Sequence, residues 1–316
     1  MAREAESFTL VSECDGLPLS GLCLLPEGAP RAAVQLTHGM CEHKERYLPL
    51  MRHLAQGGFA CFIIDHRGHG GSVKSPDDLG YFYEGGGDAL VRDMELLTRH
   101  IKRLSPDLPL FLFGHSMGSL AARVYAKRYD DEIDGLIVCG SPSRNPAAPL
   151  GKAFLRVVAA FRGDRARSNA ANAMFSGVFN KNFKSEGENA WVCGNRDVVE
   201  AYNADPLCHF SFTVNGYLNL LYLMGECYDE KNWQMKNPAL PVRFLSGELD
   251  PCRVDEAHFQ DAVETMRRVG YQNVTSRVFP DMRHEIHNEA AHEIVFCDIA
   301  ETLDNFLSAR ALRENA

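Results

Sequence analysis

Short apolar runs, each bounded by glycine, proline or aspartate, recur along the chain and predict β-strands. Two alternating stretches near the start are separated by Cys14-Asp15-Gly16 and predict a β-hairpin. Six further runs follow, at residues 32–39, 59–70, 108–116, 133–142, 240–251 and 273–284. Segments with helical periodicity separate most of them or end the chain, at about 45–56, 86–104, 117–129, 252–268 and 289–311. Continuously apolar strands that alternate with helices predict an α/β fold, with a mostly parallel, eight-stranded sheet covered by helices on both faces.

The alternation stops between residues 143 and 236, which contain no clear strand and are rich in Asn, Phe, Ala and Gly. We therefore expect a core of residues 1–142 and 237–316, with residues 143–236 inserted as a mainly helical cap, or lid. A small separate domain without a role in catalysis is the alternative. Five apolar residues of this segment have helical spacing and predict an amphipathic helix: Leu150, Phe154, Val157, Val158 and Phe161. We expect this helix to pack internally rather than rest on lipid, because a negatively charged protein is repelled by anionic membranes.

The composition is that of a globular protein, since 45% of the 316 residues are apolar and 24% are charged. The formal net charge of −9 argues against a nucleic-acid partner. The first ten residues lack the basic start and apolar run of a signal peptide, and no apolar stretch reaches the roughly 20 residues that span a bilayer. The ten cysteines show no CxxC spacing and several lie in expected buried strands, so we predict reduced thiols in a cytoplasmic protein.

The residues Gly114-His115-Ser116-Met117-Gly118 match the G-x-S-x-G pattern of a nucleophile elbow. Such an elbow requires a strand before it and a helix after it, and the flanking segments LPLFLF and SLAARVYAKRY meet both requirements. The turn would present the serine hydroxyl at the N-terminus of a helix, where backbone N–H groups favour negative charge. We therefore expect Ser116 to be a nucleophile rather than an idle residue of a glycine-rich turn.

A serine nucleophile needs a base, and the base needs an acid that orients it. With this type of elbow the three residues occur in the order Ser, Asp or Glu, then His, each after a later strand. Asp250 and His284 follow the last two expected strands, so all three side chains would meet at the carboxyl edge of the sheet. Among the twelve histidines, His287 is the main alternative to His284. The alternatives to Asp250 are Glu248 and Asp255.

Two backbone N–H groups are candidates for binding an oxyanion. One belongs to Met117, directly after the nucleophile, and the other to Met40, which follows His38-Gly39 after the third expected strand. A simple glycine-containing turn would also explain the second segment. We expect no metal site, because the chain has no H-E-x-x-H motif and the His66–His69 pair lacks a third ligand. No nucleotide cofactor is expected either, since the glycines of residues 83–90 are not followed by G-K-[ST].

Five segments together resemble α/β-hydrolases of the monoacylglycerol lipase and lysophospholipase family, a serine aminopeptidase-like family. They are HGMCEHKERY (38–47), DHRGHGGS (65–72), GHSMGS (114–119), SGELDP (246–251) and MRHEIHNE (282–289). The resemblance implies an α/β-hydrolase fold with Ser116 as nucleophile, His284 as base, Asp250 as acid, and Met40 and Met117 as backbone donors. It also implies hydrolysis of fatty-acid esters without a cofactor, beneath a cap that forms an apolar acyl channel and sometimes touches a membrane.

The expected partner is therefore a small-molecule acyl ester, with acylglycerols and lysophospholipids as the implied classes. Aromatic and aliphatic cap residues could line an acyl pocket or simply pack against the core: Phe175, Phe179, Phe183, Phe210, Phe212, Tyr217 and Leu221. Aminopeptidase or amidase activity, carbon–carbon bond hydrolysis and ligand binding without catalysis stay open. An aminopeptidase would need acids that converge on the substrate amine, and the acids of the cap show no evident convergence: Glu186, Glu188, Asp197, Glu200 and Asp205.

Overall fold

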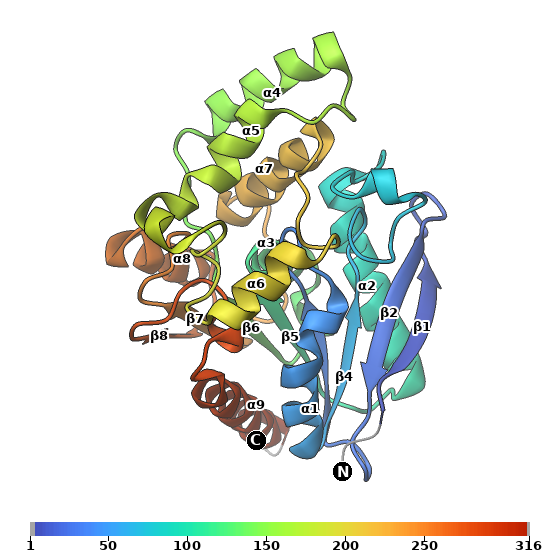
Figure 1. The fold of residues 1–316 in the computed structure, drawn as a ribbon. Coiled ribbons are helices and arrows are strands. Elements are labelled where there is room, and N and C mark those ends of the chain that lie inside the picture. The colour runs from blue at the N-terminus through green and yellow to red at the C-terminus, as the bar shows by residue number, and fades with distance from the viewer. Residues whose placement is uncertain (1–3, 315–316) are drawn as a thin grey trace.

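The computed structural model describes residues 4–314, which fold around one eight-stranded sheet (Figure 1). The strands are β1 (Glu6–Val11), β2 (Pro18–Leu24), β3 (Ala32–Thr37), β4 (Phe59–Ile64), β5 (Leu110–His115), β6 (Gly135–Cys139), β7 (Pro241–Gly247) and β8 (Asn273–Phe279). Their spatial order is β1-β2-β4-β3-β5-β6-β7-β8. The β1–β2 and β2–β4 pairs are antiparallel and the other pairs are parallel. The expected mostly parallel sheet is thus confirmed.

Helices cover both faces of this sheet. They are α1 (Leu48–Gln56), α2 (Gly86–Leu104), α3 (Met117–Tyr129), α8 (Glu256–Arg268) and α9 (His292–Glu314). Successive side chains of a strand point to opposite faces, so in β5 Leu110 and Leu112 join one hydrophobic cluster while Phe111 and Phe113 join another. Helices α2, α3 and α8 contribute to the first cluster, and α1 and α9 contribute to the second.

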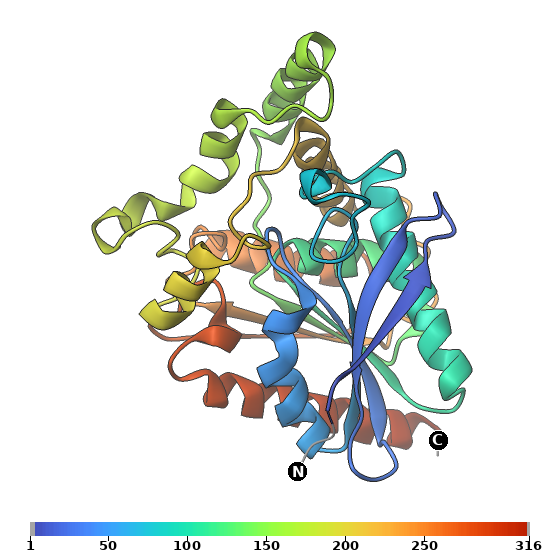
Figure 2. The same cartoon turned by 45° about the vertical axis from the view of Figure 1, so that its right-hand side comes forward.

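Residues 143–236, here called the helical insertion, lie between β6 and β7. Their helices are α4 (Ala148–Arg162), α5 (Asn169–Asn172), α6 (Arg196–Ala204) and α7 (Val214–Tyr228). Figures 1 and 2 show these helices above the edge of the sheet where the parallel strands end. Helix α7 packs against both α3 of the core and α4, and it buries Tyr217 and Leu223 completely. The insertion therefore rests on the core mainly through α7.

Helix α4 differs from the expectation. Its fully buried large apolar residue is Leu155, whereas Leu150, Val157 and Phe161 are 76%, 56% and 86% exposed. The expectation that the apolar stripe packs internally is therefore wrong for three of its five residues. The spacing predicted the helix, but the face that contacts α7 is narrower than the apolar stripe, so part of the stripe is left on the surface.

Within residues 4–314, no helix is both long enough and apolar enough to cross a bilayer. All ten cysteines lie in this range and are free thiols, most of them buried, as expected for reduced thiols of a hydrophobic core.

Candidate active site

Ser116 occupies the turn between β5 and α3 in a backbone conformation (φ 53°, ψ −120°) that residues other than glycine rarely adopt. A Cβ atom at Gly114 would lie 2.6 Å from the carbonyl oxygen of Gly118, and one at Gly118 would lie 2.4 Å from that of Thr37. Any side chain at these two positions would collide with backbone, which explains why the turn has glycine on both sides of Ser116. The serine itself lies at the N-terminus of α3.

Three loops bring Ser116, His284 and Asp250 together. His284 Nε2 lies 2.8 Å from Ser116 Oγ, and His284 Nδ1 lies 2.9 Å from Asp250 Oδ1. Asp250 follows β7 and His284 follows β8, and both side chains are buried. The backbone N–H of Cys252 donates to the same Asp250 oxygen at 2.8 Å, which fixes the carboxylate. The two ring nitrogens of one histidine thus join the hydroxyl to the carboxylate.

The alternative residues have other contacts. His287 is buried, stacks on the Tyr47 ring at a centroid distance of 5.2 Å, and has a pKa that burial lowers to about 3. Asp255 accepts a hydrogen bond from His258 N and caps α8, while Glu248 accepts one from Asp281 N. Among the described hydrogen bonds, none joins these three residues to Ser116 or His284.

The electrostatics favour a proton on His284. Burial alone would lower the pKa of His284, but the charge and hydrogen bond of Asp250 outweigh burial and raise that pKa well above its usual value. Cys252 lies beside the same ring, and burial raises the pKa of its thiol to about 11, so it is a neutral thiol at physiological pH. Asp250 is therefore the group that stabilises an imidazolium at His284.

His115 supports the loop that carries His284, a role that the sequence analysis missed. Its Nδ1 lies 3.0 Å from Glu42 Oε1, and its Nε2 lies 3.3 Å from the backbone oxygen of His284. Glu42 also accepts a hydrogen bond from the backbone N–H of Gly39. One buried carboxylate thus connects the loop after β3 with the residue before the nucleophile and, through His115, with the His284 loop.

Arg46 extends this network to a second buried carboxylate. It donates to Glu42 Oε2 at 3.2 Å and to both oxygens of Glu285, at 2.6 and 2.7 Å. Burial would raise the pKa of Glu42, but the hydrogen bond and charge of His115 and the charge of Arg46 hold it well below its usual range. Glu42 and Arg46 are four residues apart, but Glu42 precedes the short helix that contains Arg46, so helical spacing does not reveal this pair.

The loop after β3 passes directly beside the nucleophile. A Cβ atom at Gly39 would lie 2.9 Å from the Cβ of Ser116. Met40 and Met117, the two expected oxyanion donors, both line the same cavity as Ser116, and Met117 is the first residue of α3. Both residues that carry the predicted donor N–H groups thus line the cavity that contains Ser116.

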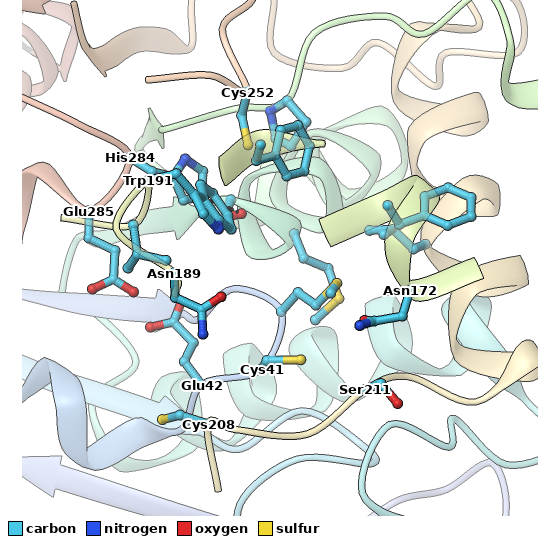
Figure 3. Close-up of a pocket in the computed structure, with 18 of the residues that line it drawn as sticks. Cys41, Glu42, Asn172, Asn189, Trp191, Cys208, Ser211, Cys252, His284 and Glu285 are labelled. Carbon is cyan, nitrogen blue, oxygen red and sulfur yellow. Dashed lines mark hydrogen bonds between the residues drawn. The ribbon is translucent and has the colours of Figure 1, made fainter. Parts of the chain in front are cut away.

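A cavity of about 350 Å³ lies between the core and the helical insertion, and Ser116 is one of the residues that line it. Figure 3 shows His284 and Trp191 in its wall. Apolar side chains of the insertion form much of its wall: Met174, Phe175, Val178, Phe179, Leu220 and Met224. Trp191 packs on the imidazole of His284, with 5.0 Å between ring centroids. Of the aromatic residues expected in an acyl pocket, Phe175, Phe179 and Phe210 line the cavity, whereas Phe212 and Tyr217 are buried in the hydrophobic core.

Three clusters of His, Cys, Asp and Glu in the described part of the chain have ligand atoms close enough to share a metal ion. Two of them, Asp250–Cys252–His284 and Glu42–His115–His287, consist of residues around Ser116. The third is His43–Asp205–Cys208. Sequence spacing could not reveal any of them, because their members come from different loops.

Comparison with known proteins agrees with this architecture. A family model described as serine aminopeptidase, S33, matches residues 28–291. A monoacylglycerol lipase from Mycolicibacterium smegmatis is 25% identical over 282 residues, which cover 89% of this chain and 91% of that protein. A monoglyceride lipase homolog from Monkeypox virus is 38% identical over 265 residues, which cover 82% of this chain and 84% of that protein.

A solved structure of a carboxyl esterase from Bacillus coagulans has the same fold. It superimposes with a TM-score of 0.87 at 24% sequence identity, and the match covers 96% of this chain and 99% of the esterase. The expected α/β-hydrolase fold is thus confirmed. Because the family model matches most of the chain, from the loop before β3 into the segment after β8, this protein belongs to the serine aminopeptidase, S33, family of α/β-hydrolases.

Proposed function

We propose that this serine ester hydrolase cleaves fatty-acid esters of the acylglycerol or lysophospholipid type, with Ser116 as nucleophile, His284 as base and Asp250 as acid. The observation that carries the proposal is the hydrogen-bonded line from Ser116 Oγ through both nitrogens of His284 to Asp250, at the base of an apolar cavity. The contact between Ser116 Oγ and His284 Nε2 is 2.8 Å, which is within the range required for direct proton transfer, and the 2.9 Å contact with Asp250 orients the ring.

The reaction would proceed through an acyl-enzyme. His284 Nε2 takes the hydroxyl proton of Ser116 as Oγ attacks the ester carbonyl, and Asp250 stabilises the resulting imidazolium. The backbone N–H groups of Met40 and Met117 bind the oxyanion. His284 then gives its proton to the leaving alcohol, and it activates a water molecule that releases the fatty acid and regenerates Ser116.

The substrate class follows from the cavity and from the relatives. The wall that the helical insertion supplies is largely apolar, which suits an acyl chain, while the polar groups gather around Ser116. The Mycolicibacterium and Monkeypox virus relatives are described as a monoacylglycerol lipase and a monoglyceride lipase homolog. In a glycerol ester with a single acyl chain, the acyl chain would contact the apolar wall and the glycerol would lie near the polar groups around Ser116.

We assign the helical insertion, residues 143–236, the role of a cap over a core formed by residues 1–142 and 237–316. The exposed Leu150, Val157 and Phe161 of α4 suit a weak contact with a lipid surface from which an acyl ester is drawn. Ten free thiols suit a reducing compartment, and we place the protein in the cytoplasm.

Amide hydrolysis has less support than ester hydrolysis. Three of the five candidate acids of the insertion already have other partners: Glu186 contacts Arg283, Asp205 contacts His43 and Glu188 contacts His209. Glu188 is the one of these three that lines the cavity. The other two of the five, Asp197 and Glu200, are not among the residues that line the cavity.

Two experiments test the proposed function. A fluorophosphonate probe should label the wild-type protein and not the Ser116→Ala variant, and ester turnover should fall by roughly 10⁴–10⁶ in that variant. A panel of monoacylglycerols, lysophospholipids and p-nitrophenyl esters of rising chain length, with an aminoacyl anilide for comparison, should then show ester turnover well above amide turnover. Absence of labelling in folded protein would contradict the assignment of Ser116, and preferred cleavage of the anilide would contradict the substrate class.

A further inference from the structure

Three side chains that can bind a metal ion meet where the helical insertion contacts the loop after β3. They are His43 of that loop and Asp205 and Cys208 of the turn between α6 and α7. Their ligand atoms all lie within 4.8 Å of one another, and His43 Nε2 is 2.9 Å from Asp205 Oδ2. We propose that His43, Asp205 and Cys208 form a zinc site that joins the insertion to the core.

The donor set indicates zinc. Magnesium and calcium prefer oxygen ligands, whereas zinc is commonly bound by a mixture of imidazole nitrogen, thiolate sulfur and carboxylate oxygen. Ligand atoms around tetrahedral zinc are about 3.3–3.8 Å apart, given bond lengths of about 2.0–2.3 Å. The His43–Asp205 contact would therefore open by about half an ångström. Asp205 is 31% exposed, which gives the ion a route from solvent.

Two further observations indicate that this cluster binds a ligand. The Cys208 side chain is 2% exposed, yet none of the hydrogen bonds found among residues 4–314 engages its thiol. On the opposite side, His43 Nδ1 lies 2.6 Å from Glu45 Oε2. In metal-binding histidines, the ring nitrogen that does not bind the metal commonly donates a hydrogen bond to a carboxylate, and this bond orients the ring. His43 thus points Nε2 toward Asp205 and Cys208 while Glu45 holds its other nitrogen.

The charges of the cluster also suit a divalent cation. His43 contacts a carboxylate at each nitrogen, and Asp205 supplies a carboxylate oxygen beside the ligand atoms. Zinc would bind Nε2 as an unprotonated nitrogen and Cys208 as a thiolate, so the thiol proton is released to solvent on binding. The nearest cations are already neutralised, since Lys44 is paired with Asp65 and Glu45. Arg46 is paired with Glu285.

The other two clusters are poorer candidates. Asp250–Cys252–His284 belongs to the proposed catalytic machinery, where a metal ion would compete with Ser116 for His284. Glu42–His115–His287 offers no sulfur, and its carboxylate is held by Arg46. The His43–Asp205–Cys208 cluster lies outside that machinery, although Cys208 lines the cavity. His43 and Asp205 are 162 residues apart in the sequence, so a search for short metal-binding motifs does not find this cluster.

Cobalt and zinc binding to the purified full chain tests the site directly. One equivalent of Co²⁺ should give a thiolate-to-cobalt charge-transfer band, and Zn²⁺, measured by competition with a chromophoric chelator, should displace it. Replacing a ligand, as in Cys208→Ser or Asp205→Asn, should abolish the band. Glu45→Gln should keep it and weaken zinc binding by about 10–100-fold, as expected for loss of an outer partner.

Cys252→Ser and Cys297→Ser are the matched controls and should bind zinc like the wild type. Absence of the band in the wild-type protein would overturn the proposal, whatever the stability of the variants. A band that Cys252→Ser removes and Cys208→Ser retains would place the ion at His284 and also overturn it. These readouts follow metal binding and not turnover, so their failure leaves the proposed ester hydrolysis untouched.

Discussion

Asp250 acts on Ser116 only through His284, because its carboxylate contacts one ring nitrogen and the serine hydroxyl contacts the other. The same contact that orients the ring also raises the pKa of His284 well above its usual value. A base must be unprotonated to accept the proton of Ser116. The proposed mechanism therefore predicts that activity is lost as the pH falls through the pKa of His284.

Asp250→Asn removes the charge and keeps the size of the side chain. In the wild-type protein, kcat/KM should rise with pH and level off above the usual histidine range, because the His284 pKa is raised. In Asp250→Asn the midpoint should move to lower pH and the plateau should fall by about 10⁴, as when the acid of a triad is replaced. Asp255→Asn, at the cap of α8, is the control and should leave the profile unchanged. Identical midpoints in wild type and Asp250→Asn would show that another group titrates.

At the residue scale, the order of residues along the chain was enough to predict most of the proposed catalytic residues. Ser116, Asp250 and His284 could be predicted because each follows a recognisable strand, and the carboxyl ends of parallel strands share one edge. Glu42 and His115 could not be assigned a role in the same way. They are 73 residues apart and acquire their roles through burial and a mutual hydrogen bond, which no local pattern encodes.

At the scale of elements, Arg283 ties the His284 loop to the segment between α5 and α6. Its guanidinium contacts both carboxylate oxygens of Glu186, at 2.7 and 2.9 Å, and the backbone oxygen of Ala190 at 2.6 Å. The next residue of that segment, Trp191, packs on His284. Arg283 thus strengthens a junction that the backbone also forms, since the N–H of Glu285 donates to the backbone oxygen of Val192 at 2.8 Å.

Arg283→Ala should loosen both partners at once. Hydrogen bonds to a charged group contribute about 1.5–3 kcal/mol each when buried, and the partial exposure of Glu186 reduces this, so we expect the local opening free energy to fall by about 1–3 kcal/mol. Hydrogen exchange should then accelerate in residues 186–194 and in 283–289. Arg196→Ala, an exposed arginine of α6, is the control and should exchange like the wild type. Faster exchange in one segment alone would contradict the coupling.

The elements themselves were largely predictable. The expected runs contain all eight strands, and most of them extend beyond the strand into the loop that follows it. Prediction failed at α4, where helical spacing gave the helix but not the face that is buried. How much of the apolar face of α4 is buried depends on how much of that face α7 covers. The sequence of α4 alone does not contain this information.

At the scale of the whole molecule, the apolar surface of α4 and much of the cavity wall belong to the helical insertion, whereas the residues of the proposed triad belong to the core. The net charge of −9 opposes anionic membranes. A lipid contact through α4 would therefore depend on burial of Leu150, Val157 and Phe161, and it should be seen best on zwitterionic vesicles.

Replacing Leu150 and Phe161 with Gln tests this contact. Burial of each side chain is worth about 1.5–3 kcal/mol, so the double variant should bind phosphatidylcholine vesicles at least about 100-fold more weakly in a co-sedimentation assay. Turnover of short, water-soluble esters should stay at the wild-type level. Leu104→Gln changes a leucine at the end of α2 that is 61% exposed, and it should leave binding intact. Equal vesicle binding by all three proteins would exclude α4 as the contact.

Strands β6 and β7 are direct neighbours, with Leu136 opposite Val242, although the whole helical insertion separates them in the chain. Because the two strands are parallel, the insertion leaves the core at the carboxyl end of β6, and the chain returns to the opposite edge of the sheet to begin β7, after α7 has packed against α3. A gene with this layout carries the proposed cap in one contiguous stretch of codons, so exchange of that stretch would replace much of the cavity wall and leave the codons for Ser116, Asp250 and His284 in place.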